Sequence, residues 1–386
     1  MLDFVVSHIE EPEVDNLDRK LELARADIRD EYLQNHNTPW IIGFSGGKDS
    51  TLVLQLVVET LLELPPSDRR RPVHVVSNDT LVEAPVVADH VERVLLRVRN
   101  GVEAMHLPVT VVKTAPKADQ TFWVNLIGRG YPSPSRTFRW CTDRMKIQPT
   151  SHYIKNKVAE SGQVILLLGV RKEESATRAV SVNRYSNGQR LNDHNDLQGC
   201  KVFRPVVNFT TDEVWQTLLQ RRPPWGGSHR ELITLYREGQ GAECPLVLSK
   251  DDAPSCGTSS SRFGCWTCTV VVKDRSMAGF IEAGHANHEQ LMDFRDWLAE
   301  IRNDPDRRMA RRRSGRATHL PDGSLVPGPF TLAARREILD RLLEVERQSG
   351  RELISTDEVE TIKYLWATDA ASVMSTAGSG NEGGEA

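Results

Sequence analysis

The stretch from residue 39 to residue 57, PWIIGFSGGKDSTLVLQLV, joins an apolar run to a short loop of small, hydroxyl-bearing and charged residues. Two adjacent glycines would let backbone N–H groups approach an anion, and the lysine beside them would add a mobile positive charge. A loop of this kind after a strand and before a helix is typical of a phosphate site. The residues that we expect at the phosphates are Ser45, Gly46, Gly47, Lys48, Asp49, Ser50 and Thr51.

The loop differs from two common nucleotide motifs. A Walker P-loop would need Gly where Ile42 stands and a hydroxyl residue where Asp49 stands. The G-x-G-x-x-G fingerprint of dinucleotide enzymes is also missing. The hexapeptide S-G-G-K-D-S instead resembles the PP-loop of ATP pyrophosphatases, which implies that it holds pyrophosphate while the α-phosphate goes to a substrate as an adenylate. The alternative is a Gly/Ser turn that happens to precede a helix.

A second segment, SRTFRWCTDRMKIQP (135 to 149), surrounds a thiol with cations. Arg139, Arg144 and Lys146 could bind the oxygens of a substrate phosphate, and they would lower the pKa of Cys141. Cys141 is therefore a candidate reactive thiol. A basic loop with an incidental buried cysteine would have the same composition.

Two further segments complete the candidate nucleotide site. In GVRKEESATR (169 to 178), Arg171 and Arg178 could bind phosphate, while Glu174 could fix an arginine or a ribose hydroxyl. In VFRPVVNFTTDEVWQTLL (202 to 219), Thr210 or Thr211 is expected to cap the helix that contains Trp215. The remaining nucleotide residues that we expect are Gly169 and Asp79. The residues expected to act in catalysis are Lys48, Asp49, Cys141 and Arg171, with Mg²⁺ helping to stabilise charge on the phosphate oxygens.

Four clustered cysteines could hold a metal: Cys244, Cys256, Cys265 and Cys268. Their spacing, C-x11-C-x8-C-x2-C, can supply four thiolates to structural zinc or to an iron–sulfur cluster. Zinc sites more often use two close pairs, and Phe263 with Trp266 would give the metal an apolar cover that suits a redox or sulfur-handling cluster. We therefore favour a [4Fe–4S] cluster, with zinc and free structural thiols as alternatives.

Taken together, the phosphate loop, the R-x-C-T-x-x-x-K element, G-x-R-x-x-E-S-x-x-R and the R-P-V-x-x-F-T segment resemble the adenylyl-sulfate and phosphoadenylyl-sulfate reductase superfamily from residue 40 to about 220. The stretches SNDTLVEAP, ECP and CGTSSSRFGCWTCTVVVKDRSM resemble the DndC/SspD-type sulfurtransferases of bacterial DNA phosphorothioation. That resemblance implies an ATP pyrophosphatase with a [4Fe–4S] cluster in a defence-associated system. It would work on DNA with a cysteine desulfurase and other phosphorothioation proteins, replacing a non-bridging phosphate oxygen by sulfur. Within that resemblance Cys141 is our candidate sulfur carrier, and an iron atom of the cluster is the alternative carrier.

Three other functions remain open. A reductase of the superfamily would place its catalytic cysteine in a C-terminal motif, but no cysteine follows Cys268 in the sequence. A tRNA thiolase also combines a PP-loop with cysteines, and it would activate a base carbonyl instead of a backbone phosphate. The third option is an ATP-binding scaffold without enzymatic activity.

The elements that would position these residues alternate along the chain. Apolar runs at 40–44, 73–79, 109–114 and 164–171 are separated by helical stretches, which predicts an α/β fold with a parallel sheet. The resemblance to PP-loop ATP pyrophosphatases implies that this fold is of the adenine nucleotide alpha hydrolase-like type. We expect an N-terminal helical lead-in (1–38), a PP-loop domain (39–235), a Cys-rich segment (236–275), a helical C-terminal region (276–370) and a disordered tail (371–386).

Composition adds few restrictions. The formal net charge of −4 makes no general case for nucleic-acid binding, and no apolar run reaches the length of a membrane span, so we expect a cytoplasmic protein. The arginine-rich run at 306–319 could bind the phosphates of a DNA backbone or form a solvent-exposed surface. For His285 and His288, at one-turn spacing, an exposed helix end is the favoured interpretation. A homo-oligomer is left open.

Overall fold

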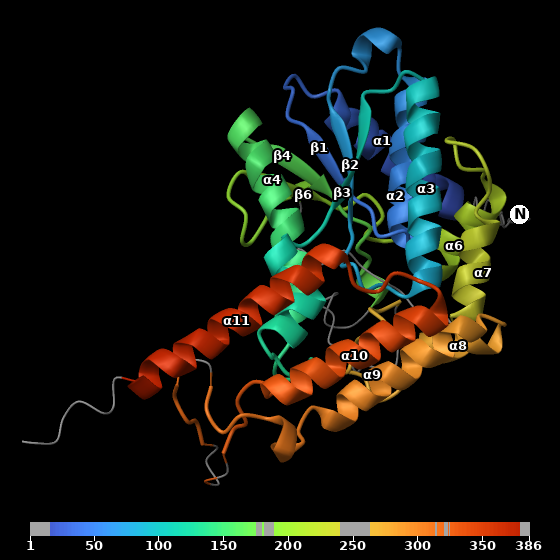
Figure 1. Cartoon of the computed structure of the whole chain (residues 1–386). Coiled ribbons are helices and arrows are strands. Elements are labelled where there is room, and N and C mark those ends of the chain that lie inside the picture. Colours follow the sequence, from blue (N-terminus) through green and yellow to red (C-terminus); the bar gives the residue numbers. More distant parts are fainter. Residues whose placement is uncertain are drawn as a thin grey trace, which may run out of the picture. The chain divides into compact units, whose positions relative to one another are not determined.

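The computed structural model of the chain describes residues 16–174, 180, 189–239, 263–312, 315–319, 323 and 325–378. Within these residues the strands form one sheet in the order β3-β2-β1-β4-β6-β5 (Figure 1). The strands are β1 (Trp40–Gly43), β2 (Val73–Asn78), β3 (Val109–Thr114), β4 (Val164–Leu167), β5 (Leu191–Asp193) and β6 (Cys200–Phe203).

The central strands are apolar because both faces of the sheet are covered. Every residue of β1 and of β4 is buried, as expected for parallel strands with helices on both sides. Trp40 pairs in register with Val73 of β2 and Ile165 of β4, and both pairings are parallel. The predicted α/β fold is confirmed. The sheet is not wholly parallel, however, because β5 pairs antiparallel with β6 at one edge, and our sequence reasoning identified neither of these strands.

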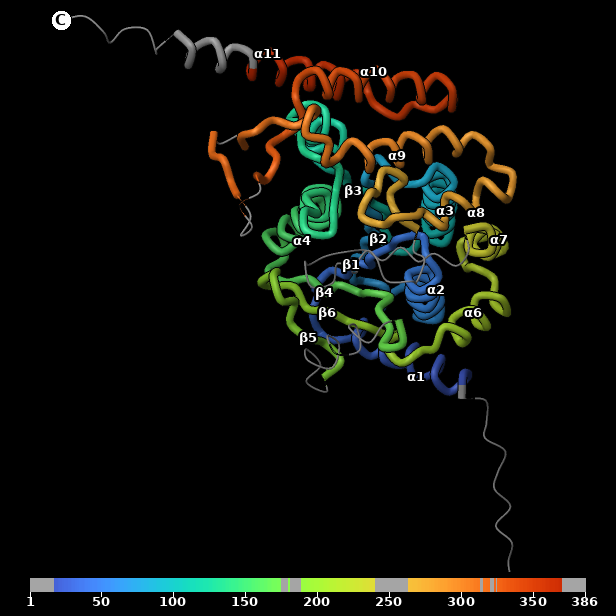
Figure 2. The backbone as a smooth tube through the Cα atoms, turned by 90° about the horizontal axis from the view of Figure 1, so that it is seen from below, coloured from blue at the N-terminus to red at the C-terminus, as the bar shows by residue number. Residues whose placement is uncertain are grey.

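The helices fill the intervals between strands and most of the C-terminal part. In chain order they are α1 (Asn16–Tyr32), α2 (Lys48–Glu63), α3 (Pro85–Ala104), α4 (Gln148–Ser161), α6 (Thr211–Gln220), α7 (Arg230–Glu238), α8 (Arg275–Glu282), α9 (Glu289–Ile301), α10 (Leu332–Ser349) and α11 (Thr356–Gly378). Helix α2 packs against β1, α1 and α6. Figure 2 shows the chain from below, with the strands and these helices in the same view. Helix α11 reaches into the range 371–386 that we expected to be a tail. No described helix has the combination of length and apolar composition that crossing a membrane requires.

Two compact units share the chain. The first takes residues 1–76, 94–112 and 154–230, and the second takes 77–93, 113–153 and 231–386. The sequence suggested consecutive domains with boundaries at 235 and 275. The chain instead enters the second unit three times, because the segments that follow β2 and β3 fold with the C-terminal helices.

The second unit has an aromatic core of its own. The rings of Trp123 and Trp266 lie 5.7 Å apart, and both lie about 6 Å from Phe294, at 6.0 and 6.1 Å. Trp123 precedes a π-helical turn, η3 (Val124–Gly128), which packs against α10 and α11. Trp266 comes from the C-x2-C segment, so this core fixes the position of two candidate metal ligands.

Candidate functional site

The predicted phosphate loop lies between β1 and α2, in the first unit. Gly46 has a φ of +75°, in the left-handed region that favours glycine. Gly47 is the N-cap of α2 and makes no side-chain capping bond. Among the described residues, Gly47 offers no side chain to cap the first N–H groups of α2, and the start of this helix has the polarity of an anion site.

The serine hydroxyls shape this loop from within. The Oγ atoms of Ser45 and Ser50 are 3.1 Å apart, and Ser50 Oγ donates to the Gly47 carbonyl at 3.0 Å. The backbone N–H of Ser45 donates to Ser50 Oγ at 3.2 Å. These bonds tie both ends of the loop together, so the two hydroxyls act as structural groups in this conformation.

The end of β4 touches the start of α2. A Cβ added at Gly169 would lie 2.7 Å from the carbonyl carbon of Asp49 and 2.8 Å from the N atom of Ser50. Only glycine leaves room for this approach, because the neighbouring atoms belong to the backbone. In the sheet order, β1 lies between β2 and β4, so the chain reverses its winding direction at β1 and β4. Open α/β sheets bind ligands at such a point.

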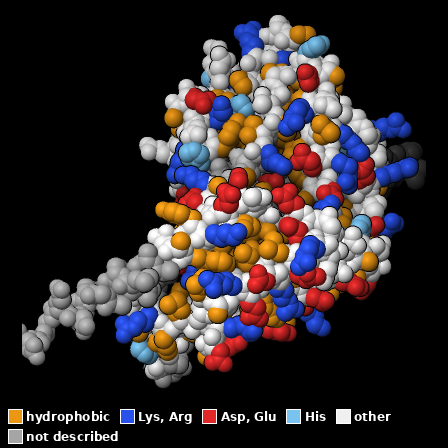
Figure 3. Space-filling view, in the orientation of Figure 1, with side chains coloured by type: hydrophobic (Ala, Val, Ile, Leu, Met, Phe, Trp, Pro, Cys, Tyr) orange, Lys and Arg blue, Asp and Glu red, His pale blue; other side chains and the backbone are white. Residues whose placement is uncertain are grey.

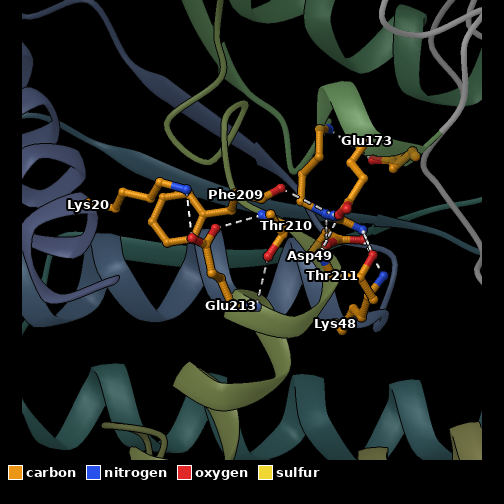
Figure 4. A network of polar contacts seen from close by, with 10 residues as sticks. Lys20, Lys48, Asp49, Glu173, Phe209, Thr210, Thr211 and Glu213 are labelled. Carbon is orange, nitrogen blue, oxygen red and sulfur yellow. Dashed lines mark hydrogen bonds and ion pairs between the residues drawn. The ribbon is translucent and has the colours of Figure 1, made fainter. Parts of the chain in front are cut away.

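Asp49 is at the centre of a buried ion network (Figure 4). Its carboxylate accepts from Lys48 Nζ at 2.9 Å and from Arg171 Nε at 2.5 Å. The side chains of Lys48 and Arg171 are almost completely inaccessible, at 0% and 1% exposure. Charges removed from water to this extent must be paired, which explains why an aspartate follows the lysine.

The rest of the Arg171 guanidinium is held by neighbouring groups. It donates to the Phe209 carbonyl at 3.2 Å, to Thr211 Oγ1 at 3.1 Å and to Glu173 Oε2 at 3.3 Å. Arg171 thus points at Asp49 and at the segment before α6. In this arrangement it positions the phosphate loop through Asp49, whereas we had expected it to bind a phosphate directly.

The R-P-V-x-x-F-T segment therefore supports the loop. Thr210 is the N-cap of α6 and forms a reciprocal capping box with Glu213, which confirms one of the two caps we expected. Glu213 also pairs with Lys20 of α1 at 2.6 Å. Our sequence analysis did not predict that this segment supports the phosphate loop. The one feature that could have indicated it is the hydroxyl of Thr211, beside the capping threonine.

Two other expected nucleotide residues have clear local roles. Glu174 accepts the backbone N–H of Arg171 at 3.0 Å and closes a turn after β4. Asp79 belongs to the second unit, where it accepts from the Leu81 N–H at 2.8 Å and pairs with Lys113 at 3.2 Å. Arg178 lies outside the described residues.

The described half of the cysteine cluster is a C-x2-C turn in the second unit. The N–H of Cys268 donates to the carbonyl of Cys265 at 3.0 Å, and Trp266 N–H donates to the Val82 carbonyl at 3.0 Å. Thr80 Oγ1 lies 3.4 Å from Cys265 Sγ. The stretch SNDTLVEAP therefore contacts the C-x2-C turn. Two of the segments that carry the resemblance to DndC/SspD-type sulfurtransferases thus lie together in the second unit.

Cys141 and Lys146 lie close enough to Cys265 to influence its titration. Burial raises the pKa of the Cys265 thiol to about 12, Lys146 acts to lower this pKa, and Glu83 and Cys141 act to raise it. Burial, followed by the charge of Asp79, raises the pKa of Glu83 to about 7. The candidate sulfur carrier and one candidate metal ligand therefore belong to a single cluster of ionisable groups.

The C-x2-C turn is fixed from the side of α9 by Arg295. This buried guanidinium donates to the carbonyl of Cys268 at 2.9 Å and to that of Val272 at 3.1 Å. Sequence reasoning did not identify Arg295, because a single arginine inside an amphipathic helix gives no signal of its own.

Cys265 and Cys268 are the two candidate thiolate ligands of the cluster that the structure describes. Metal binding would have to displace the proton of the buried Cys265 thiol. Cys244 and Cys256 lie outside the described residues. Within the part that is described, no three His, Cys, Asp or Glu side chains converge in a metal-binding arrangement. Cys200 is buried in β6, apart from this cluster.

Two of the predicted substrate-phosphate residues, Arg144 and Lys146, follow Cys141 on a π-helical turn, η4 (Thr142–Ile147), while Arg139 precedes Cys141. Arg144 donates to Gln120 Oε1 and to the hydroxyl of Tyr131, the latter at 3.2 Å, and it lies over the Tyr131 ring. Arg139 and Lys146 are half-buried. Arg144 therefore has structural partners, so it would reach a phosphate only by exchanging them.

The arginine-rich run divides into structural and exposed members. Arg307 pairs with Asp304 and Glu337, and Arg308 donates to three backbone carbonyls while lying over the ring of Phe330. Among the described residues of the run, the exposed arginines are Arg311, Arg312 and Arg316, and Arg313 lies outside the described residues. On the face in Figure 3, positive and negative side chains are interspersed.

His288 differs from our expectation of an exposed helix end. Only 6% of this residue is accessible, so the expectation was wrong for His288. It ends a short 3-10 turn, η6 (Ala286–His288), that connects α8 to α9. This turn places the imidazole 6.3 Å from the ring of Phe280 and 5.6 Å from that of His285.

Residues 39–271 match the family model described as "Phosphoadenosine phosphosulfate reductase domain". The uncharacterized protein MJ0066 of Methanocaldococcus jannaschii is 26% identical over 225 residues, which are 55% of this chain and 40% of that protein. The chain thus spans less than half of this relative.

Solved structures show weak overall similarity. A phosphoadenylyl-sulfate reductase from Candida auris gives a TM-score of 0.34 at 14% identity, covering 54% of this chain and 87% of the other. The U34-tRNA thiolase NcsA from Methanococcus maripaludis, solved with its [4Fe–4S] cluster, gives 0.33 at 13% identity, covering 73% and 80%. An FMN adenylyltransferase from Candida glabrata gives 0.37 at 11% identity, covering 87% and 83%.

Proposed function

Because the chain belongs to the phosphoadenosine phosphosulfate reductase domain family, we propose that it is an ATP pyrophosphatase that prepares a substrate for sulfur transfer. The substrate that we propose is the DNA backbone, in which one non-bridging oxygen of a phosphodiester is replaced by sulfur. The observation that carries the nucleotide part is the phosphate loop, whose glycine conformation and uncapped helix start suit a polyphosphate.

The first step would be adenylyl transfer. A non-bridging oxygen of the substrate phosphodiester attacks the α-phosphorus of ATP, the bond to the β-phosphate breaks, and pyrophosphate leaves. The start of α2 would bind the departing pyrophosphate, and Mg²⁺, when bound, would supply positive charge that stabilises the phosphate oxygens. Lys48 and Arg171 hold Asp49, and Asp49 fixes the first turn of the helix against Gly169. The loop is thereby preorganised before the nucleotide binds.

The second step would replace oxygen by sulfur. Sulfide attacks the activated phosphorus, AMP departs with the former non-bridging oxygen, and the proton of the sulfide goes to solvent. If the sulfur arrives as a persulfide from a cysteine desulfurase, a thiol reductant must afterwards cleave the S–S bond. Cys141 is the candidate carrier, because it neighbours Lys146 and Cys265 in the second unit.

The proposed [4Fe–4S] cluster would supply an iron that binds sulfide. Cys265 and Cys268 would hold it from the C-x2-C turn, with Cys244 and Cys256 as the other proposed ligands. Thr80 and Arg295 would keep that turn in place. The partners that we propose are DNA, a cysteine desulfurase and the other proteins of a phosphorothioation system of the DndC/SspD type.

The deciding experiment measures where sulfur goes. The purified protein, ATP, a cysteine desulfurase with cysteine, the other system proteins and either duplex DNA or tRNA are incubated together, and the nucleic acid is digested and analysed by mass spectrometry. Phosphorothioate dinucleotides from DNA support the proposal. Thiolated nucleosides from tRNA would establish the alternative thiolase instead. Absence of pyrophosphate release from ATP under either condition would contradict both enzymes and favour a binding scaffold.

The metal is tested separately. Anaerobically purified protein should contain iron and sulfide and absorb visible light, and Cys265→Ser should lower its iron content. The matched control is Cys200→Ser, which changes a buried thiol whose pKa is also raised to about 12 but which lies in β6. A colourless, zinc-loaded wild-type protein would overturn the assignment of the cluster.

A further inference from the structure

The helix that follows Cys141 changes its form close to Pro149. The π-helical turn η4 ends at Ile147, and α4 begins directly after it at Gln148. In an α-helix the N–H of residue 149 would donate to the carbonyl of Met145, but a proline has no N–H and its ring crowds that carbonyl. The sequence K-I-Q-P therefore prevents an intact α-helix from running back through Met145, and it favours a wider turn there.

The carbonyl of Met145 receives a hydrogen bond from another part of the second unit. Asn78 Nδ2, at the end of β2, donates to it at 2.9 Å. Oδ1 of the same amide accepts from Thr114 Oγ1, at the end of β3, at 3.1 Å. Thr114 Oγ1 also lies 3.5 Å from Oγ1 of Thr150, a completely buried residue of α4. The ends of two neighbouring strands are thereby tied to both sides of Pro149.

The π-helical form decides which side chains share a face of this turn. Hydrogen bonds in a π-helix join residues five positions apart, and the N–H of Gln148 donates in this way to the carbonyl of Asp143. Cys141, which has helical backbone angles, and Lys146 are also five positions apart. An α-helix would separate these two by about 140° around its axis, whereas the wider turn brings them to the same side. Their common influence on the pKa of Cys265 agrees with this placement.

We propose that Asn78 is a positioning residue for Cys141, because its amide holds η4 in the π-helical form and so keeps the Lys146 ammonium beside the thiol. An anionic reactant would then meet the sulfur at a fixed positive charge. This inference deepens the proposed function and rests on it only for the role of Cys141 as sulfur carrier. The hydrogen bonds of Asn78 do not depend on which nucleic acid is modified.

The test compares two alkylating reagents of different charge at Cys141. Iodoacetate is an anion and iodoacetamide is neutral, and both react with the same thiolate. The ratio of their rates is therefore independent of the thiolate fraction, and it reports the charge beside the sulfur. The full-length protein is treated with each reagent at one pH and one ionic strength, and the modified Cys141 peptide is quantified by mass spectrometry.

We expect Asn78→Ala to lower the iodoacetate-to-iodoacetamide ratio about fivefold, the factor that a unit charge about 4 Å from the anion supplies in water. Lys146→Gln should lower the ratio equally. The double variant should lower it no further, because Asn78 acts through Lys146. Asn78→Leu, which keeps the volume of the side chain without its hydrogen bonds, gives a second measurement.

The matched control is Asn125→Ala. Asn125 is completely buried in η3, and its Nδ2 donates to the carbonyl of Thr121 at 2.9 Å, so this variant loses the same kind of bond elsewhere in the second unit. The control should keep the wild-type ratio. The proposal is overturned by an unchanged ratio in both Asn78 variants, by an equal fall in the control, or by a further fall in the double variant. Failure of the proposed function would show separately, as wild-type phosphorothioate formation by Cys141→Ser.

Discussion

Adding one methyl group at Gly169 should misplace the phosphate loop without unfolding the protein. In Gly169→Ala the new Cβ would meet backbone atoms of Asp49 and Ser50 at 2.7 to 2.8 Å. A normal contact needs about 3.5 Å or more, so β4 and the start of α2 must separate by roughly 0.7 Å. Overpacking of this kind costs about 1 to 3 kcal/mol, and a displacement near 1 Å can lower catalysis about 100-fold.

The assay compares pyrophosphate release from ATP with the urea midpoint of unfolding. Gly128→Ala is the matched control, because its new Cβ would meet the flexible end of the Leu365 side chain at 2.8 Å, with no backbone atom nearer than 3.6 Å. We expect the control to keep wild-type pyrophosphate release, while Gly169→Ala loses about two orders of magnitude. Wild-type release by Gly169→Ala would refute the argument that this contact sets the loop.

Three further predictions concern charge. Arg171→Met leaves the carboxylate of Asp49 without its guanidinium, so the free energy of unfolding in urea should fall by about 3 to 5 kcal/mol. The double variant Arg171→Met/Asp49→Asn should lose less free energy of unfolding than the sum of the two single losses. Additive losses would contradict the pairing. Burial lowers the pKa of His229 from 6.5 to about 4, so the unfolded state binds more protons between these values and stability is lost as pH falls from about 6.5 towards 4. The shift corresponds to about 3 kcal/mol, and His229→Gln should remove that part of the pH dependence in denaturation curves. Changing Arg311, Arg312 and Arg316 together to alanine should weaken DNA binding and reduce its salt slope by about three, while Arg347→Ala on α10 should not. An unchanged slope would place the DNA contact elsewhere.

The local pattern of the sequence determined the phosphate loop and the central strands. An apolar run followed by S-G-G-K-D-S predicts a strand, a glycine turn and a helix start, and β1, Gly46 and α2 occur in those places. Such features depend on neighbours within a few residues, so their physical causes are present in a short segment. The capping threonine at residue 210 was predictable for the same reason.

Contacts between distant segments were decided only by the tertiary structure. The charge of Arg171 and its place after a strand suggested a phosphate ligand. Packing of the segment before α6 instead surrounds its guanidinium with acceptors and directs it to Asp49. Cys265 acquires Thr80, Lys146 and Cys141 as neighbours because three separate parts of the chain meet in the second unit.

His288 shows the same limit most simply. Its spacing from His285 indicates one turn of helix, yet the direction of its ring depends on how α8 and α9 pack. Sequence by itself determined which residue types were available and which local conformations they prefer. Burial, pairing and the role of each charged side chain followed from tertiary packing, because these properties depend on atoms that are far apart in the chain.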